Sequence, residues 1–153
     1  MHDPALRQVV ILDRAVLDIA YNGGLAPVRS SEITSRQGIP RRYLEPVLQE
    51  LVRHNVLIGI RGPSGGYRLA RERRRVSIGD IVRTVRGLET VEDPIEAGAG
   101  SALGQEVLRP LWLELQDETM RRLDALTLED LCTRAHRAGI AGRATEGGGD
   151  FAI

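Results

Sequence analysis

Three kinds of residue are scarce in this 153-residue sequence: it has one cysteine, no lysine, and aromatic side chains at only 3% of its positions. The single cysteine, Cys132, excludes an internal disulfide and any metal site built from several cysteines of one chain. Scarce aromatics argue against a binder of single-stranded nucleic acid, which needs several stacking platforms. The sequence also lacks an apolar run of about 18 residues, as a membrane span requires, and we expect no secretory leader. We therefore expect a cytoplasmic protein with no membrane partner.

Arginine, by contrast, is abundant and unevenly distributed. Residues 1–86 hold 15 arginines and 8 acidic residues, a balance of +7, whereas residues 87–153 hold 6 arginines and 13 acidic residues, a balance of −7. This split predicts that one part of the molecule meets a polyanion while the other has a different task. Hydrophobic residues make up 42% of the chain, which is enough for a packed core.

The first half of the chain has the apolar spacing of three helices. We expect the first helix over about residues 5–21. Ser30 is expected to cap a short second helix in which Ile33 points inward. Pro40 suits the first position of a third helix. The inward stripe of that third helix consists of Leu44, Val47, Leu48 and Leu51.

A β-hairpin is predicted directly after the third helix. Residues 56–60 and 67–69 have the composition of short strands, with a glycine-rich loop, Arg61–Gly66, between them. Ser77 and Asp80 then have the spacing of a capping box that opens a fourth helix. This order of elements is the layout of a winged helix-turn-helix. The predicted fold class is therefore mainly α with a small β-hairpin (α+β), and residues 1–86 are the predicted winged-helix domain.

The second half is predicted to serve assembly. Residues 87–103 are expected to form a connecting loop, residues 104–137 a long helix and a short C-terminal helix, and residues 138–153 a disordered glycine-rich tail. A long amphipathic helix on a small domain usually needs a partner surface. Trp112 is expected in the core, with a place in a ligand pocket as the alternative. Dimerisation is assigned to the leucines spaced along the long helix: Leu108, Leu111, Leu115 and Leu123.

The third helix and the hairpin carry residues suited to double-stranded DNA. An α-helix fits the major groove, and an arginine such as Arg41 or Arg42 can donate two hydrogen bonds to one guanine. The hydroxyl of Tyr43 can reach a phosphate. Arg61, at the base of a glycine-rich hairpin, can enter the minor groove. The alternative is that the arginines form a solvated helix face and the glycines a turn that binds nothing.

Several stretches of the sequence also resemble a known family. They are Gln37–Ile39 with Tyr43–Glu45, the block Arg61–Ala70 (RGPSGGYRLA), Ile78–Val82, Leu108–Trp112 and Leu126–Leu131. Over roughly residues 10–131 the chain resembles the IscR/NsrR/CymR-like family of bacterial winged-helix transcription regulators. The resemblance implies a homodimer built on the long helix, reading a two-fold symmetric operator. It implies a minor-groove position for Arg61 and a major-groove position for the start of the third helix. The residues predicted to contact DNA are Ser31, Arg41, Arg42, Tyr43, Glu45, Arg61, Gly62, Ser64, Gly65 and Tyr67.

Two features depart from the family pattern. Some members hold an iron–sulfur cluster with three cysteines, whereas residues 87–106 contain none here, so we expect no such cluster and no other cofactor. Pro46 has no N–H to complete a helical hydrogen bond. We therefore expect the regular third helix either to begin near Glu45 or to bend at the proline.

The remaining reactive residues leave two interpretations open for Cys132. A small buried residue beside Leu128 and Leu131 is favoured, and a redox switch is the alternative. We expect no metal site and no enzyme, because neither a metal-ligand spacing nor a nucleophile with a neighbouring base is present. The sequence thus predicts a dimeric DNA-binding transcription regulator, acting as a repressor and answering to an unidentified effector. The alternative is a winged-helix module that binds proteins and not DNA.

Overall fold

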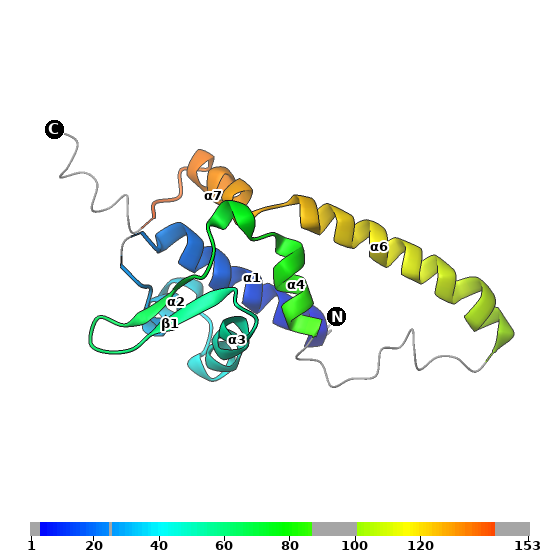
Figure 1. Cartoon of the computed structure of the whole chain (residues 1–153), viewed down its shortest axis with the longest axis horizontal. Helices are drawn as coiled ribbons and strands as arrows, with labels where there is room; N and C mark the ends of the chain where they lie inside the picture. Colours follow the sequence, from blue (N-terminus) through cyan, green and yellow to red (C-terminus); the bar gives the residue numbers. More distant parts are fainter. Residues whose placement is uncertain (1–3, 25, 87–100, 143–153) are drawn as a thin grey trace.

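The computed structural model describes residues 4–24, 26–86 and 101–142. Its elements, in chain order, are α1 (Pro4–Asn22), α2 (Ser30–Gln37), α3 (Arg41–Arg53), β1 (Leu57–Ile60), β2 (Gly66–Leu69), the 3-10 turn η1 (Arg73–Arg75), α4 (Ile78–Arg86), the π-helical turn η2 (Gly104–Leu108), α6 (Arg109–Ala125) and α7 (Leu128–Arg137). All but η2 and α6 gather into one body, from which α6 projects (Figure 1). The predicted fold class, mainly helical with one hairpin, is confirmed.

The core of this body collects the apolar faces of the first three helices. Leu12, Val16 and Ile19 of α1 are buried in one cluster with Ile33 of α2. The predicted inward stripe of α3 is buried in the same cluster, with Leu44, Leu48 and Leu51 fully inaccessible and Val47 nearly so. The periodicity therefore predicts the inward faces of α2 and α3 correctly.

A buried carboxylate fixes α2 against α1. Asp18 accepts hydrogen bonds from Nε and Nη2 of Arg36, at 3.0 and 2.7 Å, and from Nε2 of Gln37 at 2.8 Å. These bonds compensate for the cost of burying the Asp18 charge. Gly38 then ends α2 with a left-handed φ of 65°, and its N–H donates to the Thr34 carbonyl. The hydrogen bonds of Asp18 and the turn at Gly38 together set the direction in which the chain enters α3.

The start of α2 differs from the prediction. Arg29, with extended backbone, precedes the helix, and Ser30 is its first helical residue, so the expected Ser30 cap is wrong. Instead, the Glu32 carboxylate reaches back and accepts a hydrogen bond from the Arg29 backbone N–H at 3.0 Å. Pro40 similarly lies one residue before the first helical residue of α3 and not in its first turn.

Helix α3 is regular from Arg41 onward, although it contains Pro46. Of the two alternatives, a start near Glu45 is therefore wrong, and a bend at Pro46 stays a prediction. Pro46 is exposed, so its ring meets solvent and not the core. The helix loses one internal hydrogen bond there, the one that the Arg42 carbonyl would accept.

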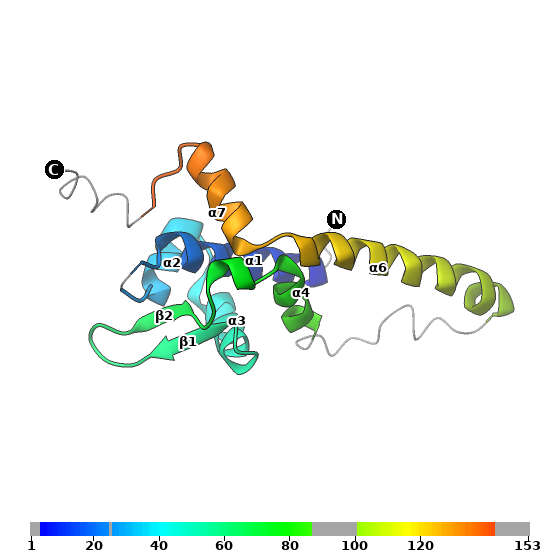
Figure 2. The same cartoon turned by 45° about the horizontal axis from the view of Figure 1, so that its top comes forward.

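Strands β1 and β2 form the predicted hairpin beside α3 (Figure 2). They pair antiparallel, with Leu57 opposite Leu69 at the base. The segment before α2 also lies along β2, because Val28 and Tyr67 exchange two backbone hydrogen bonds of 2.7 and 2.8 Å. Gly65 in the loop must be glycine, since a Cβ there would lie 2.2 Å from the Ile60 carbonyl oxygen.

The predicted start of α4 is confirmed, and α7 begins in the same way. The Ser77 hydroxyl accepts from the Asp80 N–H, and the Asp80 carboxylate accepts from the Ser77 N–H, each at 3.0 Å. Thr127 and Asp130 make the same reciprocal pair at 3.1 and 3.0 Å, and so begin α7.

Helix α7 packs on the body, against α1 and η1. Leu128 and Cys132 are buried in the same cluster as the residues of α1. Beyond α7, the Tyr21 hydroxyl donates a hydrogen bond to the Ile140 carbonyl. Of the predicted loop and tail, residues 87–100 and 143–153 lie outside the described residues. The structure does describe residues 101–103 and 138–142.

Helix α6 touches the body at one end only (Figures 1 and 2). There Arg83 of α4 donates hydrogen bonds of 2.8 and 2.6 Å to the two carboxylate oxygens of Asp124. Gly79 allows this close approach, since a Cβ would lie 1.9 Å from Asp124 Oδ1. Trp112, near the other end, is 53% exposed, so its predicted place in the core is wrong. No helix in the described ranges has the length and hydropathy of a membrane span.

Candidate nucleic-acid interface

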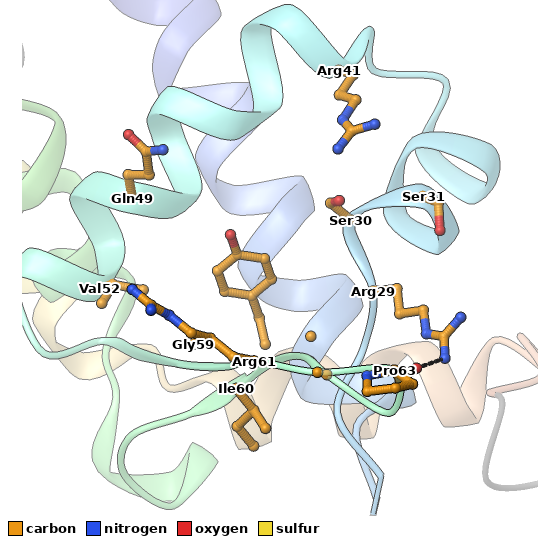
Figure 3. Close-up of a pocket in the computed structure, with 14 residues that line it drawn as sticks. Arg29, Ser30, Ser31, Arg41, Gln49, Val52, Gly59, Ile60, Arg61 and Pro63 are labelled. Carbon is orange, nitrogen blue, oxygen red and sulfur yellow. Dashed lines mark hydrogen bonds between the residues drawn. The ribbon is translucent and has the colours of Figure 1, made fainter.

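A groove of about 700 Å³ lies between α3, the start of α2 and the hairpin (Figure 3). Three arginines line the groove. Arg41 lies in the first turn of α3, Arg29 lies directly before α2, and Arg61 directly follows β1. Ser30 and Ser31 add hydroxyl groups from the first turn of α2. The fold therefore converges cationic and hydrogen-bonding groups on one concave surface.

The structure brings together six of the ten residues predicted to contact DNA. Those that line the groove are Ser31, Arg41, Arg61, Gly62, Gly65 and Tyr67. Arg42, Tyr43 and Ser64 are exposed but do not line it, and Glu45 is half-buried beside Arg41. Tyr67 is itself half-buried and packs against the core, so its aromatic ring has a structural role in addition to any contact with a ligand.

The first turn of α3 has its own internal contacts. Nε of Arg41 donates to Oε1 of Glu45 at 2.6 Å, and this hydrogen bond raises the pKa of the exposed Arg41 above its ordinary value. The Arg42 guanidinium lies 4.7 Å from the centre of the Tyr43 ring, a cation–π distance. Each of the two arginines thus contacts a neighbouring side chain of its own helix before any ligand binds.

The exposed face of α3 includes two residues that the sequence-based assignment omitted. Arg42, Pro46, Gln49 and Arg53 are all exposed and follow one another at helical spacing. Gln49 also lines the groove, and a glutamine can bond an adenine edge through both its oxygen and its nitrogen. Gln49 and Arg53 lie about one and two turns beyond Pro46, on the same face as Arg42, and this spacing was the signal that could have identified them.

Arg29 was also missed, and no local signal could have revealed it. Its side chain donates a hydrogen bond to the carbonyl of Pro63, 34 positions later in the chain, and the contact is drawn in Figure 3. This bond ties the hairpin loop to the start of α2. It therefore fixes one wall of the groove relative to the other.

The groove has the chemistry of a binding surface and not of a catalytic centre. Arginine, serine, glutamine and backbone N–H groups recognise phosphates and base edges. Within the part of the chain that the structure describes, no three histidine, cysteine, aspartate or glutamate residues cluster as metal ligands would.

Cys132 lies far from these groups in sequence and is a buried free thiol. Burial raises the pKa of the Cys132 thiol, although the nearby Arg73 guanidinium acts in the opposite direction. A buried thiol with a raised pKa has little thiolate to react, which favours the structural interpretation of this residue.

Comparisons with known proteins agree with this geometry. A family model described as Rrf2, iron-dependent transcriptional regulator, matches residues 7–134. The HTH-type transcriptional regulator IscR of Escherichia coli (strain K12 / DH10B) is 30% identical over 131 residues, which cover 84% of this chain and 80% of that protein. The structure of T. potens IscR has a TM-score of 0.71 at 30% identity, covering 88% of this chain and 89% of that one. CymR (YrzC), the global cysteine regulator of B. subtilis, has a TM-score of 0.65 at 26% identity, over 83% and 94% of the two chains.

These matches confirm the family resemblance found in the sequence and span both the winged helix and the long helix. The proteins concerned are transcription regulators and not enzymes. The chain belongs to the Rrf2 family of DNA-binding, winged-helix transcription regulators.

Proposed function

We propose that the protein is a homodimeric regulator that reads a palindromic operator, with α3 in the major groove and the hairpin in the adjacent minor groove. The observation that carries this proposal is the convergence of Arg29, Arg41 and Arg61 on one groove from three different elements. The arginine-rich first half of the chain supplies the charge that attracts DNA phosphates. This supports DNA over the alternative of a protein-binding module.

The dimer in this proposal is built on α6. Leu108, Leu111, Trp112 and Leu115 lie on one side of the helix, and each is between 43% and 53% exposed. An exposed apolar stripe of this kind on a projecting helix marks a surface that another protein surface buries. A second copy of the chain supplies an identical stripe across a two-fold axis. Leu123, which was also assigned to dimerisation, is instead half-buried against the protomer's own core.

A dimer of this form fixes the distance between its two winged-helix domains. The two α3 helices then enter major grooves about one helical turn, ~34–36 Å, apart or a multiple of it. Repression is the mode we assign, because a dimer that occupies DNA blocks access to a promoter without any further activating contact. In a reporter strain, loss of the protein should raise transcription from the operator, and a fall would identify an activator.

We propose that regulation here does not use a cysteine-ligated iron–sulfur cluster. The chain has one cysteine, and it is buried in the core on α7, so the donor set that such a cluster requires does not fit this protein. Protein purified without oxygen should be colourless. A visible absorption band together with acid-labile sulfide would contradict this proposal.

The test of the DNA-binding mode is the salt dependence of binding. Genomic fragments enriched by the protein are titrated by fluorescence anisotropy at several salt concentrations. Because arginine–phosphate contacts release counterions, the logarithm of affinity should fall steeply and linearly with the logarithm of salt. A flat dependence, or no enrichment of DNA at all, would favour the protein-binding alternative.

A further inference from the structure

A second cavity, of about 560 Å³, lies behind the hairpin. Its walls are the end of α1, the segment that runs from β2 through η1, and Glu129 of α7. Tyr67 lines the groove described above, whereas its neighbour Arg68 lines this cavity. Successive residues of a strand point to opposite faces. Strand β2 therefore lies between the DNA groove and this cavity, with one face on each.

The cavity has an excess of positive charge. Four arginines and two glutamates line it, which leaves a balance of +2. Arg73 is ion-paired with Glu129, and Arg74 with Glu72. Arg71 has only a long contact of 3.9 Å with Asp80. Arg68 has no ion pair among the described residues. Two guanidinium groups therefore remain available in a hollow whose volume suits a small molecule.

We propose that this cavity is the effector site, and that it binds a small dianion carrying carboxylate or phosphate groups through Arg68 and Arg71. Guanidinium groups bind such oxyanions with two parallel, charge-assisted hydrogen bonds. A ligand with two negative charges neutralises the excess of +2. The paired Arg73 and Arg74 keep the wall of the cavity in shape.

A ligand at this place is positioned to influence DNA reading. Arg68 belongs to β2, and the residue before it, Tyr67, is hydrogen-bonded to Val28 beside the DNA groove. Gly66 on the same strand also lies close to this segment, since a Cβ there would lie 2.5 Å from the Val28 carbonyl oxygen. A dianion that prefers one hairpin position would thereby change operator affinity. This coupling rests on the proposed function, whereas anion binding itself does not.

The experiment is calorimetric titration of the full chain with succinate and with inorganic phosphate, which are both dianions at pH 8, at that pH and constant ionic strength and without DNA. At least one of them should bind saturably at one site per chain, and Arg68→Ala or Arg71→Ala should weaken binding by roughly tenfold or more. Arg75→Ala is the matched control, because Arg75 is exposed on the same segment but does not line the cavity. It should leave affinity unchanged. Circular dichroism melts establish that each variant is folded.

The outcomes separate the two proposals. Saturable binding of succinate alone assigns carboxylate ligands, and of inorganic phosphate alone phosphate ligands. Absence of saturable binding with both anions, or an equal loss in Arg75→Ala, overturns the anion site. An anion that binds but leaves operator affinity unchanged at saturation overturns the effector role. If the protein binds an anion but binds no DNA, the proposed function is wrong and the anion site is still supported.

Discussion

Nε of Arg41 lies 2.6 Å from Oε1 of Glu45, one turn later in α3. Both residues were expected to contact DNA, and in the free protein they contact each other. The carboxylate therefore neutralises one of the three arginines at the groove. A phosphate or a guanine that binds Arg41 must either share it with Glu45 or displace that side chain.

Glu45→Gln should strengthen non-specific DNA binding. The amide keeps the shape of the side chain but removes the negative charge that opposes phosphates. We expect affinity for random duplex DNA to rise several-fold and the slope of log affinity against log salt to steepen by about one unit. Anisotropy titrations measure both. Glu118→Gln, at an exposed position on α6, is the control, and equal effects of the two variants would remove Glu45 from the interface.

Arg61→Ala should weaken operator binding while the protein stays folded and dimeric. Arg61 is exposed at the end of β1 and lines the groove, and loss of such an arginine costs about 1–3 kcal/mol of binding free energy. A gel-shift titration measures the loss. Arg137→Ala removes an exposed arginine from α7 and should have little effect. Unchanged affinity in Arg61→Ala would exclude the hairpin from DNA recognition.

Leu111→Glu should give a monomer. The substitution places a charge in the middle of the apolar stripe of α6, where the proposed interface would bury it without a partner. Leu113→Glu is the matched control, because Leu113 is 40% exposed on the opposite side of the same helix. Light scattering coupled to size-exclusion chromatography distinguishes the two. A dimeric Leu111→Glu, or a monomeric wild type, would show that α6 is not the dimer contact.

Asp13 predicts a pH dependence of stability. Burial raises its pKa from 3.8 to about 6, and its Oδ1 is buried without a hydrogen-bond partner in the described part of the chain. Because the folded pKa lies above the unfolded one, this group destabilises the fold progressively as pH rises from about 4 to 6, and fully above that.

Asp13→Asn removes this ionisation. Its melting temperature should therefore exceed that of the wild type above pH 6, and the difference should shrink towards pH 4. Thermal melts at a series of pH values measure this. Glu118→Gln again serves as the control for loss of an exposed carboxylate. A constant difference across the whole range would mean that Asp13 does not titrate as its burial implies.

Local chemistry explains which parts of the fold could be predicted. The pairs Ser77–Asp80 and Thr127–Asp130 lie three residues apart, so the sequence alone reveals the reciprocal hydrogen bonds that begin α4 and α7. The inward position of Ile33 likewise follows from helical spacing. Such features depend on neighbours a few positions away.

Features that depend on distant partners could not be predicted. Arg29 reaches Pro63 across 34 positions, and this contact, not a serine cap, accompanies the start of α2. The spacing of Trp112 indicates an apolar face but not what covers it, and the structure leaves it exposed on α6. Pro46 was expected either to delay α3 or to bend it; the helix nevertheless begins at Arg41, and the exposure of Pro46 lets it tolerate the lost hydrogen bond.

The most direct test of the DNA-binding account is hydroxyl-radical footprinting on a genomic fragment selected by the protein. If α3 and the hairpin of two protomers read one operator, backbone protection should appear as two equivalent blocks related by a two-fold axis. Each block should include a protected minor-groove segment that disappears in Arg61→Ala. A single asymmetric block, or minor-groove protection that persists without Arg61, would contradict the account.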